Sequence, residues 1–418
     1  MRIVAIDTLR KCLQFLPADD PRIVASGNHA APWQLLAAAD DAFERYRLFM
    51  LNAPTGIPTR TGVRLETSFV GGGMRRQPSL AYYPSRLSLV PALFRQRVRP
   101  DIVLLHTAPP RNGMLSLGIE VNILPAAIEA ARAHGGVVIA QVNPNMPYTF
   151  GDAVIPVDDV DFAVEVDEPL GELVPSAIGD VQRVIGEHVA FLVPQGATLQ
   201  LGIGAIPDAT LNSLGRHRDL RIWSEMVSDG VLHLEKQGAL GDDVISTSFA
   251  AGSQELYDWL HDNPRVVFCR TERANDPAVI ARQPRMTSIN AALQVDLFVQ
   301  ANASYVNGRI YSGFGGQTDF IVGALHAPDG HAIIALPSWH PGTDTSTIVD
   351  QLCCPATSFQ HSYVVTEQGV ATVWGRSQRE QAMELIEHAA APQARDPLRT
   401  RFEEMFDHGE ARHDCRRH

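Results

Sequence analysis

The stretch TLQLGIGAIPDATLNSLG (residues 198–215) sets the fold class of this chain. Its first part, TLQLGI, is an apolar run of the length of a buried strand. Its last part predicts a helix, with Pro207 at the first helical position and Gly215 where the helix stops. Gly202 and Gly204 join the two parts. A buried strand, a tight turn and a helix in this order are typical of parallel α/β sheets.

The same alternation continues along the chain in both directions. We expect further strands at 102–106, 137–142, 161–166, 220–223, 266–269 and 332–337. We expect helices at 33–49, 122–134, 174–193, 207–214, 253–262 and 376–390. The segment 144–158 is rich in proline and turn-forming residues and predicts a loop near a sheet edge. The chain is therefore expected to have an α/β fold with mainly parallel strands.

Length and composition indicate an ordinary globular protein with two domains. The 418 residues exceed the size at which one hydrophobic core usually stops growing. The composition is 45% hydrophobic and 20% charged, with a mean hydropathy of −0.06. We predict the domain boundary at 190–198, after the long helix, which gives domains at 1–192 and 193–418.

Charge and residue patterning exclude several classes of function. The net charge is −12 and the pI about 5.6, which argues against a general nucleic-acid binder. No run of about eighteen apolar residues predicts a membrane span, and the N-terminus lacks the layout of a signal peptide. The five cysteines are scattered and form no CxxC pair, so we expect a reduced, cytoplasmic setting.

Two glycine-rich turns are candidate ligand-binding loops. In GIGAIPDA (202–209), glycine backbone and a helix N-terminus would suit a thioester oxygen or a phosphate. A tight turn without a ligand explains the same pattern, which is not the dinucleotide motif GxGxxG. In YSGFGGQTDF (311–320), three glycines predict either a backbone nest facing a ligand or a bulge. Asn307-Gly308 just before it predicts a hairpin.

Glu225, in WSEMVSDG (223–230), is the candidate nucleophile. It follows an expected strand, and side chains at the carboxyl ends of strands line the usual ligand crevice of an α/β sheet. Carboxylates can act as nucleophiles, and backbone donors on the two glycine turns could hold a developing oxyanion. A helix cap or a salt bridge is the alternative role for such a carboxylate.

Two other segments carry weaker candidates. FVGGGMRR (69–76) predicts either a loop that closes over an anionic substrate or a mobile surface loop. The C-terminal tail holds His413, Asp414, Cys415 and His418, but their spacing is not that of a structural metal site, and we expect no metal.

Several motifs in order give a resemblance to a known family. They are VLLHTAPPRNGMLSLGIEV (103–121), IAQVNPNMPYTFGDAVIPV (139–157), LQLGIGAIPDATLNSL (199–214), SEMVSDGVLHLEKQGAL (224–240), TSINAALQVDLFVQA (287–301), GRIYSGFGGQTDFIVGAL (308–325), AIIALPS (332–338) and YVVTEQGVATVWGRSQREQA (363–382). Together they resemble the acetyl-CoA hydrolase/transferase family, and within it the 4-hydroxybutyrate and butyryl-CoA:acetate CoA-transferases. The match covers nearly the whole chain.

The resemblance implies a fold, a site and a set of partners. The implied fold is two related open-sheet α/β domains of the class I CoA-transferase type, with the active site between them and CoA mainly against the second domain. Glu225 corresponds to the family's catalytic glutamate. The expected oxyanion and CoA-binding residues are Gly202, Ile203, Gly204, Ala205, Gly313, Gly315, Gly316 and Gln317. A candidate substrate loop contains Gly72, Met74, Arg75, Asn145 and Pro147.

The chain departs from the family pattern at one notable place. Relatives usually have Gly-Thr-Ile-Ser-Arg after the ALPS strand, whereas this chain has Asp344-Thr345-Ser346-Thr347, with Thr347 replacing the arginine. The loop GGGMRR also differs from the typical family loop. Both departures concern acyl specificity and CoA affinity, and neither touches Glu225.

Three hypotheses for function remain open at this stage. The first is a CoA-transferase between short-chain carboxylates, a homodimer with coenzyme A as substrate and no tightly bound cofactor, metal, flavin or nicotinamide. The second is an acyl-CoA hydrolase that uses the same glutamate and admits water. The third is a CoA-binding protein without turnover, against which the intact Glu225 and both glycine turns argue.

Overall fold

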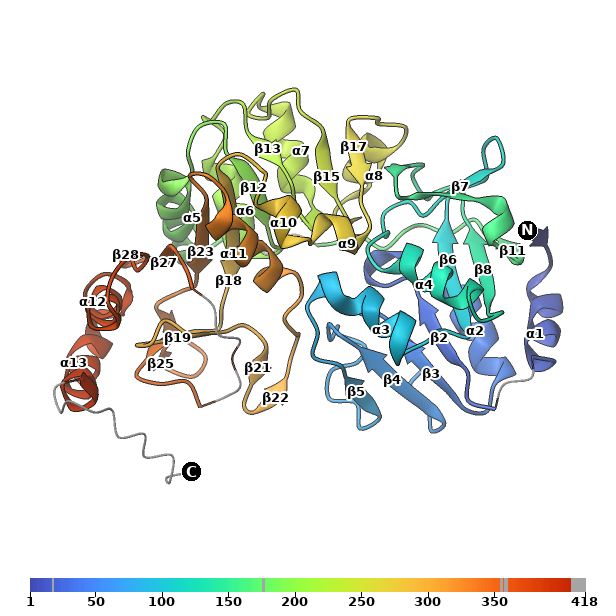
Figure 1. Cartoon of the computed structure of the whole chain (residues 1–418), viewed down its shortest axis with the longest axis horizontal. Coiled ribbons are helices and arrows are strands. Elements are labelled where there is room, and N and C mark those ends of the chain that lie inside the picture. Colours follow the sequence, from blue (N-terminus) through green and yellow to red (C-terminus); the bar gives the residue numbers. More distant parts are fainter. Residues whose placement is uncertain (17–18, 175–176, 354–355, 357–359, 407–418) are drawn as a thin grey trace.

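The computed structural model describes residues 1–16, 19–174, 177–353, 356 and 360–406. Two α/β lobes lie side by side, one built by the N-terminal and the other by the C-terminal part of the chain (Figure 1). Within these residues, no helix combines the length and the apolar character needed to cross a bilayer.

The N-terminal sheet has eight strands, and every neighbouring pair in it is parallel. In spatial order they are β1 (Arg2–Ile3), β11 (Phe162–Glu165), β8 (Val137–Val142), β6 (Ile102–Thr107), β2 (Arg22–Ala25), β3 (Tyr46–Phe49), β4 (Val63–Thr67) and β5 (Leu80–Tyr82). The central strands β2 and β6 are buried along their whole length, as expected for a sheet covered on both faces. The strands predicted at 102–106, 137–142 and 161–166 are confirmed.

The C-terminal sheet has six strands, five of them parallel. In spatial order they are β13 (Arg221–Ile222), β12 (Thr198–Leu201), β18 (Met286–Ala291), β23 (His331–Ala335), β27 (Tyr363–Thr366) and the antiparallel edge strand β28 (Gly369–Thr372). The strands predicted at 198–203, 220–223 and 332–337 are confirmed. Two open, mainly parallel sheets confirm the predicted α/β fold class.

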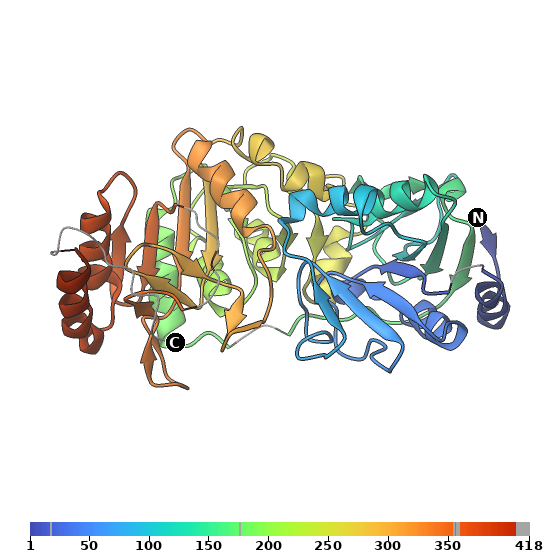
Figure 2. The ribbon, with the colours of Figure 1, turned by 60° about the horizontal axis from the view of Figure 1, so that its bottom comes forward.

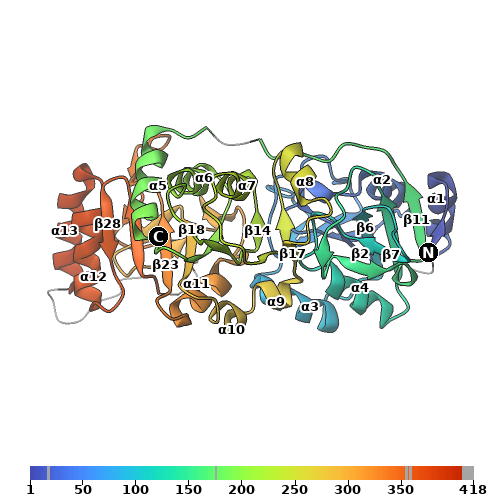
Figure 3. The ribbon, with the colours of Figure 1, turned by 90° about the horizontal axis from the view of Figure 1, so that it is seen from above.

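Helices cover both faces of each sheet (Figure 3). One layer contains α1 (Ile6–Gln14), α2 (Trp33–Ala42), α5 (Asp180–Leu192), α6 (Ala205–Ser213), α7 (Asp229–Lys236) and α8 (Gln254–Leu260). The opposite layer contains α3 (Val90–Gln96), α4 (Leu124–Arg132), α9 (Thr271–Ala274), α10 (Pro277–Ile280) and α11 (Gln317–His326). Beyond the outer edge of the C-terminal sheet lie α12 (Gln378–Glu384) and α13 (Pro392–Phe406), as Figure 2 also shows.

Short strand pairs and turns complete the fold. The two-stranded pairs are β7 (Met114–Ser116) with β10 (Val154–Pro156), β14 (Met226–Val227) with β16 (Phe249–Ala250), β21 (Tyr305–Val306) with β22 (Arg309–Ile310) and β24 (Trp339–His340) with β25 (Thr345–Ser346). One three-stranded sheet contains β15 (Ile245–Thr247), β17 (Val266–Phe268) and β9 (Phe150–Gly151), and the other contains β20 (Ala301–Asn302), β19 (Gln294–Asp296) and β26 (Ile348–Val349). The short helical turns are the 3-10 turns η1 (Asn28–Ala30), η2 (Leu87–Leu89) and η3 (Val157–Asp159) and the π-helical turn η4 (Leu385–Ala389). The hairpin predicted at Asn307-Gly308 is confirmed by the pairing of β21 with β22.

Several predicted helix limits need correction. The helix predicted at 33–49 ends at Ala42, because Tyr46–Phe49 forms the mostly buried strand β3 between β2 and β4. The helix predicted from 174 begins at Asp180. The helix predicted from Pro207 begins at Ala205, so Pro207 is its third residue, still in the first turn, where a backbone N–H has no helical acceptor. The other predicted helices are confirmed within a few residues at each end.

The segment 144–158 is not simply a loop. It contains β9 and β10, and β9 pairs in parallel with β17 of the C-terminal part of the chain. The strand predicted at 266–269 is therefore confirmed, and it also joins the two lobes. Two ion pairs reinforce the junction, Arg270 with Glu129 at 2.6 Å and Arg111 with Asp262 at 2.5 Å.

The packing of α5 bears on where the two lobes divide. This helix contacts α6 and also β23, β27 and β28 of the C-terminal sheet. The helix α5 therefore packs with the C-terminal lobe, and the division after residue 192 stays a prediction. One buried apolar cluster includes Leu105 of β6 and Leu199 of β12, so the hydrophobic core is continuous between the lobes.

Candidate active site

Each sheet changes the direction of its strand order at one point. In the N-terminal sheet the order runs from β2 to β3, β4 and β5 on one side, and from β6 to β8 and β11 on the other. In the C-terminal sheet the same change falls between β12 and β18. Loops at the carboxyl ends of strands diverge at such points, which makes them the usual ligand sites of open α/β sheets.

One cleft of about 230 Å³ lies at both of these points. Asn28, just after β2, contributes to its lining from the N-terminal lobe. Gly202, after β12, and Asn290, at the end of β18, contribute from the C-terminal lobe. Another cavity, about 320 Å³, lies by α6, α7 and α8 and contains none of the predicted site residues. The fold therefore selects the cleft between the lobes as the candidate site.

Glu225 lines this cleft and is fixed through its backbone. Two residues before Glu225, Trp223 forms a β-bridge with Ser246. Strand β14 begins at Met226, directly after Glu225. The carbonyl oxygen of Glu225 accepts hydrogen bonds from the N–H groups of Ser248 at 2.9 Å and Phe249 at 3.0 Å. The carboxylate therefore stands between two short strands, close to the strand end predicted from the sequence.

The surroundings of the Glu225 carboxylate make it less acidic than an ordinary glutamate. The pKa of Glu225 is raised to about 7, mainly by burial and in smaller part by the negative charges of Asp319 and Glu120. A hydrogen bond from Nδ2 of Asn275 to Oε2, at 3.0 Å, and one from the backbone of Gly316 act in the opposite direction. A desolvated carboxylate with few donors is a stronger base and nucleophile than a solvated one.

The turn SGFGG (312–316) lies against this carboxylate. Gly313, Gly315, Gly316 and Gln317 all line the cleft. A Cβ added at Gly316 would overlap both the Glu225 carboxylate and the Asn275 amide, so this position has room only for glycine. Gly316 is also the N-cap of α11, a helix the sequence analysis did not predict. Backbone N–H groups and the positive end of a helix dipole therefore meet at Glu225.

The turn GIG (202–204) forms the facing part of the cleft. Gly202 and Ile203 line it, and the Ile203 side chain is partly exposed. Gly204 has a φ of 115°, which L-residues rarely adopt, and is the N-cap of α6, which begins at Ala205. Gly204 and Ala205 themselves are not among the lining residues. Like SGFGG, this turn opens directly into a helix N-terminus.

The loop 69–76 of the N-terminal lobe packs against the SGFGG turn. The N–H of Val70 donates to the carbonyl of Ser312 at 2.7 Å. Arg75 stacks on the ring of Tyr311 at 3.8 Å and donates from Nε to its carbonyl at 3.0 Å. Met74 is fully buried, and of this loop only Phe69 lines the cleft. Gly72, Met74 and Arg75 therefore support the site from outside its lining.

Asn145 and Pro147 lie outside the cleft lining. The side chain of Asn145 donates to Asp167 at 2.8 Å and to the carbonyl of Glu168 at 3.0 Å. The metal-type residues His413, Asp414, Cys415 and His418 fall outside the described residues. Among the residues the structure does describe, no group of three or more histidines, cysteines or acids is arranged to hold a metal ion.

The sequence analysis missed most of the residues that surround Glu225. Glu120 is 2% exposed and accepts hydrogen bonds from Asn28 and Asn122, which line the cleft. Asp319 is fully buried at the start of α11, where burial raises its pKa to about 6. An acid within the apolar run LGIEV was the one sequence signal that pointed to Glu120.

Comparison with known proteins now identifies the family. The model of the acetyl-CoA hydrolase/transferase N-terminal domain matches residues 63–175, and that of the C-terminal domain matches residues 252–402. The chain belongs to the acetyl-CoA hydrolase/transferase family. The predicted resemblance is thereby confirmed.

Curated relatives and solved structures match this chain over most of their length. A 4-hydroxybutyrate coenzyme A transferase from Clostridium kluyveri is 40% identical over 81% of each chain. The crystal structure of RipA from Yersinia pestis has a TM-score of 0.89 at 27% identity and covers 97% of both chains. The structure of a 4-hydroxybutyrate CoA-transferase from Porphyromonas gingivalis has a TM-score of 0.82 at 31% identity, over 97% of this chain and 98% of that one.

Thr347, which replaces the arginine expected in this family, is buried outside the cleft lining. Its Oγ1 donates to the carbonyl of Pro337 at 2.5 Å, and its carbonyl accepts from the N–H of Val295 at 2.9 Å. In this chain the position therefore connects the residue before β26 to the segment after β23 and to β19.

Proposed function

We propose that this chain is an acyl-CoA:carboxylate CoA-transferase in which Glu225 carries the CoA as a covalent thioester. The observation that carries the proposal is the half-buried carboxylate between two glycine turns, each of which opens into a helix. It combines a nucleophile with backbone donors for an oxyanion, in a cleft that both lobes line.

The first half of the reaction begins on an acyl-CoA. A carboxylate oxygen of Glu225 attacks the thioester carbon, and the carbonyl electron pair moves onto its oxygen. Collapse of this oxyanion breaks the C–S bond, releases the CoA thiolate and leaves a mixed anhydride on Glu225. The thiolate then attacks the glutamyl carbonyl, which forms the glutamyl-CoA thioester and frees the acyl group as a carboxylate.

The second half reverses these steps with another acid. The acceptor carboxylate attacks glutamyl-CoA and forms a new anhydride, and the thiolate then attacks the acyl carbonyl. The products are the new acyl-CoA and a regenerated Glu225 carboxylate, so the kinetics are ping-pong. Binding of the long, non-reacting part of CoA offsets the energy of the anhydride.

The two glycine turns are the proposed oxyanion sites. Gly316 adjoins the carboxylate itself and suits the oxyanion formed on Glu225, and Gly202 and Ile203 on the facing turn suit the acyl oxyanion. Loss of one such donor typically costs about 2.7–4 kcal/mol of transition-state stabilisation. Gly204, Ala205, Gly313, Gly315 and Gln317 are proposed to shape these turns and the CoA channel.

The raised pKa suits the task of Glu225. Attack requires the ionised form, and a pKa of about 7 leaves a substantial ionised fraction at neutral pH. Burial also makes conversion to a neutral thioester more favourable than it would be for a solvated carboxylate. The same environment therefore supports both nucleophilic attack and storage of CoA.

The remaining features of the proposal follow from the family. The substrates are short-chain carboxylates and their CoA esters, such as acetate with butyrate or 4-hydroxybutyrate. The protein acts in the cytoplasm as a homodimer, takes coenzyme A as a substrate and has no tightly bound cofactor or metal. The domain division and a supporting role for the loop of Gly72, Met74 and Arg75, and for Asn145 and Pro147, belong to the same proposal.

Steady-state kinetics with butyryl-CoA and acetate test this function. The proposal predicts acetyl-CoA formation with parallel double-reciprocal plots, and no activity for Glu225→Gln. Free CoA released without acetyl-CoA would instead establish the hydrolase alternative, in which water intercepts the intermediate. An active Glu225→Gln variant would overturn the assignment of the nucleophile.

A further inference from the structure

Glu120 is a buried carboxylate that the proposed reaction does not use. It is 2% exposed, and all the donors that hydrogen-bond to its carboxylate oxygens are amide N–H groups. Nδ2 of Asn28 donates to both carboxylate oxygens, at 3.0 and 2.8 Å, and Nδ2 of Asn122 donates to Oε1 at 2.8 Å. The backbone N–H of Gly27 adds a further hydrogen bond.

This set of partners is unusual for a buried acid. A buried carboxylate normally has a cationic partner, as Glu66 has Arg22 at 2.7 Å. In the described part of the chain, no arginine, lysine or histidine forms an ion pair with Glu120. Burial accordingly raises the pKa of Glu120 to about 7. Burying a carboxylate without a cationic partner costs folding free energy, and such carboxylates are expected at functional sites rather than in a purely structural core.

Glu120 fixes the orientation of three amide side chains. In its ionised form the Glu120 carboxylate only accepts hydrogen bonds, and both Asn28 and Asn122 present Nδ2 to it. Oδ1 of Asn28 then accepts from Nδ2 of Asn52 at 2.7 Å, and Oδ1 of Asn122 accepts from the N–H of Ile123 at 2.5 Å. Asn28, Asn52 and Asn122, here called the amide wall, all line the cleft.

The backbone of the amide wall is also specialised. Asn28 and Asn52 have φ angles of 46° and 43°, a left-handed conformation that few residues other than glycine and asparagine adopt readily. A Cβ added at Gly27 would overlap the carbonyl of Leu51. The two loops that present Asn28 and Asn52 therefore fit each other closely, which limits alternative positions for their amides.

A short backbone relay joins Glu120 to Glu225. The carbonyl of Ser248 accepts hydrogen bonds from the N–H groups of Val121 and Asn122, at 3.1 and 3.2 Å. The N–H groups of Ser248 and Phe249 donate in turn to the carbonyl of Glu225. Glu120 itself forms an antiparallel bridge with Phe249. Two residues of the C-terminal lobe thus hold the segment of Glu120 and the segment of Glu225 in one arrangement.

Two carboxylates and one neutral amide act on the Glu225 carboxylate. Glu120 faces it from the N-terminal lobe, Asp319 from α11, and the neutral amide of Asn275 from the end of α9. Asp319 is itself held by Ser88, through Oγ at 2.8 Å and N–H at 3.2 Å, with Arg86 and Asp276 as its charged neighbours. Both acidic neighbours of Glu225 oppose its ionisation.

From these contacts we propose that Glu120 is a positioning residue of this active site. It sets the orientation of the amide wall against the acceptor carboxylate, and its negative charge tunes the ionisation of Glu225. The inference rests on the proposed function, because it assigns Glu120 a role in the reaction at Glu225. It adds a residue from the N-terminal lobe that contacts no reacting atom.

Two variants separate the two effects of Glu120. Glu120→Gln keeps the shape, removes the charge and turns an amide nitrogen toward donors. We expect the acidic limb of the kcat/KM profile to move to lower pH by at least about half a unit, and the KM for acetate to rise about three- to tenfold. Glu120→Asp keeps the charge but withdraws the carboxylate, so only the KM for acetate should rise, with the pH profile unchanged.

The control is Glu165→Gln, which removes one exposed carboxylate at the end of β11. It should leave both readouts at the wild-type value. A folded Glu120→Gln enzyme with wild-type pH limb and KM would overturn the proposal. Should that variant fail to fold, a Glu120→Asp enzyme with an unchanged KM for acetate would overturn it. A wild-type protein without CoA transfer would instead refute the proposed function, so the two failures are distinguishable.

Discussion

Asn275 donates a hydrogen bond from Nδ2 to Oε2 of Glu225 at 3.0 Å, across fifty residues of sequence. The amide lies at the end of α9, and its own Oδ1 is 3.1 Å from the Thr271 hydroxyl, which acts as donor. Asn275 is therefore pre-oriented to hold one carboxylate oxygen of Glu225 and leave the other free. Its placement is what makes Glu225 a defined nucleophile rather than a loosely buried acid.

Asn275→Ala should lower kcat about ten- to a hundredfold, the usual range for a hydrogen bond to a charged group. It should also move the acidic limb of the pH–rate profile to higher pH, because the lost hydrogen bond favoured the ionised form of Glu225. Asn212→Ala, an exposed position on α6, is the matched control and should behave as wild type. A limb that moves to lower pH would contradict the assigned role of Asn275.

Gly316→Ala should abolish transfer while the protein still folds. The added methyl group occupies the space of the Glu225 carboxylate, and the displaced side chain can no longer meet the oxyanion donors. Gly179→Ala is the control, because Gly179 is exposed and a Cβ there meets only the end of the flexible Gln182 side chain. Circular dichroism measures whether both variants fold, and the transfer assay measures their activity. Retained activity in Gly316→Ala would show that the turn does not adjoin the reacting carboxylate.

Glu225→Gln should stabilise the protein at alkaline pH. Because the pKa of Glu225 is raised on folding, the folded state binds its proton more tightly than the unfolded state does. The wild type therefore loses stability as the pH rises from about 4.5, the unfolded value, through about 7. The variant lacks this loss, so its melting temperature should exceed that of the wild type at pH 8 and approach it at pH 5. An equal difference in melting temperature between the variant and the wild type at pH 5 and pH 8 would contradict the raised pKa of Glu225.

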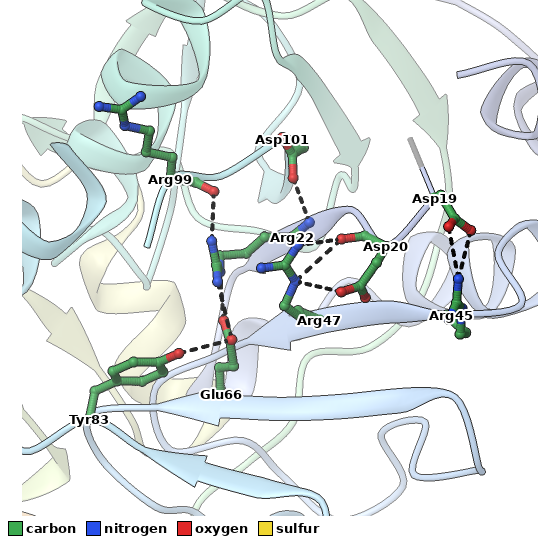
Figure 4. A network of polar contacts seen from close by, with 9 residues as sticks. All are labelled: Asp19, Asp20, Arg22, Arg45, Arg47, Glu66, Tyr83, Arg99 and Asp101. Carbon is green, nitrogen blue, oxygen red and sulfur yellow. Dashed lines mark hydrogen bonds and ion pairs between the residues drawn. The ribbon is translucent and has the colours of Figure 1, made fainter. Parts of the chain in front are cut away.

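Glu66 forms the centre of a buried network in the N-terminal sheet (Figure 4). Its carboxylate pairs with Arg22 at 2.7 Å and accepts a hydrogen bond from Tyr83 at 3.0 Å. Glu66→Gln leaves the Arg22 charge buried without its partner and should lower the free energy of unfolding by about 3–5 kcal/mol.

The exposed pair of Asp19 and Arg45, drawn in the same figure, is the control for Glu66. Solvent screens this pair, so Asp19→Asn should leave the urea midpoint unchanged. Equal effects of the two substitutions on the midpoint would show that the Arg22–Glu66 pair contributes no more than a surface contact.

The strands that were predicted, such as those at 102–106 and 198–203, could be recognised because each is a short apolar run bounded by turn residues. The sequence analysis did not predict strands β2, β3, β4, β5, β18, β27 and β28 of the two main sheets. The helix predicted at 33–49 was too long, since local composition does not reveal that Tyr46–Phe49 inserts between β2 and β4. The segment 144–158 was predicted as a loop because the partner of β9, β17, lies more than a hundred residues away.

The same limit applies to the site. Glu225 could be predicted because it follows an expected strand. The glycine turns could be predicted because closely spaced glycines fit neither a helix nor the interior of a strand. Asn275, Asp319, Glu120 and the amide wall are ordinary residues in sequence and become site residues only through tertiary contacts. The loop 69–76 was predicted either to close over an anionic substrate or to be a mobile surface loop. The sequence alone does not reveal that Arg75 contacts Tyr311 of the SGFGG segment.

The most direct test of the account is to trap the enzyme during turnover. The protein is incubated with butyryl-CoA, treated with borohydride, digested and examined by mass spectrometry. The account predicts that the γ-carboxyl group of Glu225 is reduced to an alcohol, because borohydride reduces a thioester but leaves a free carboxylate intact. An unmodified Glu225 in an enzyme that is transferring CoA, or a modification at another residue, would contradict it.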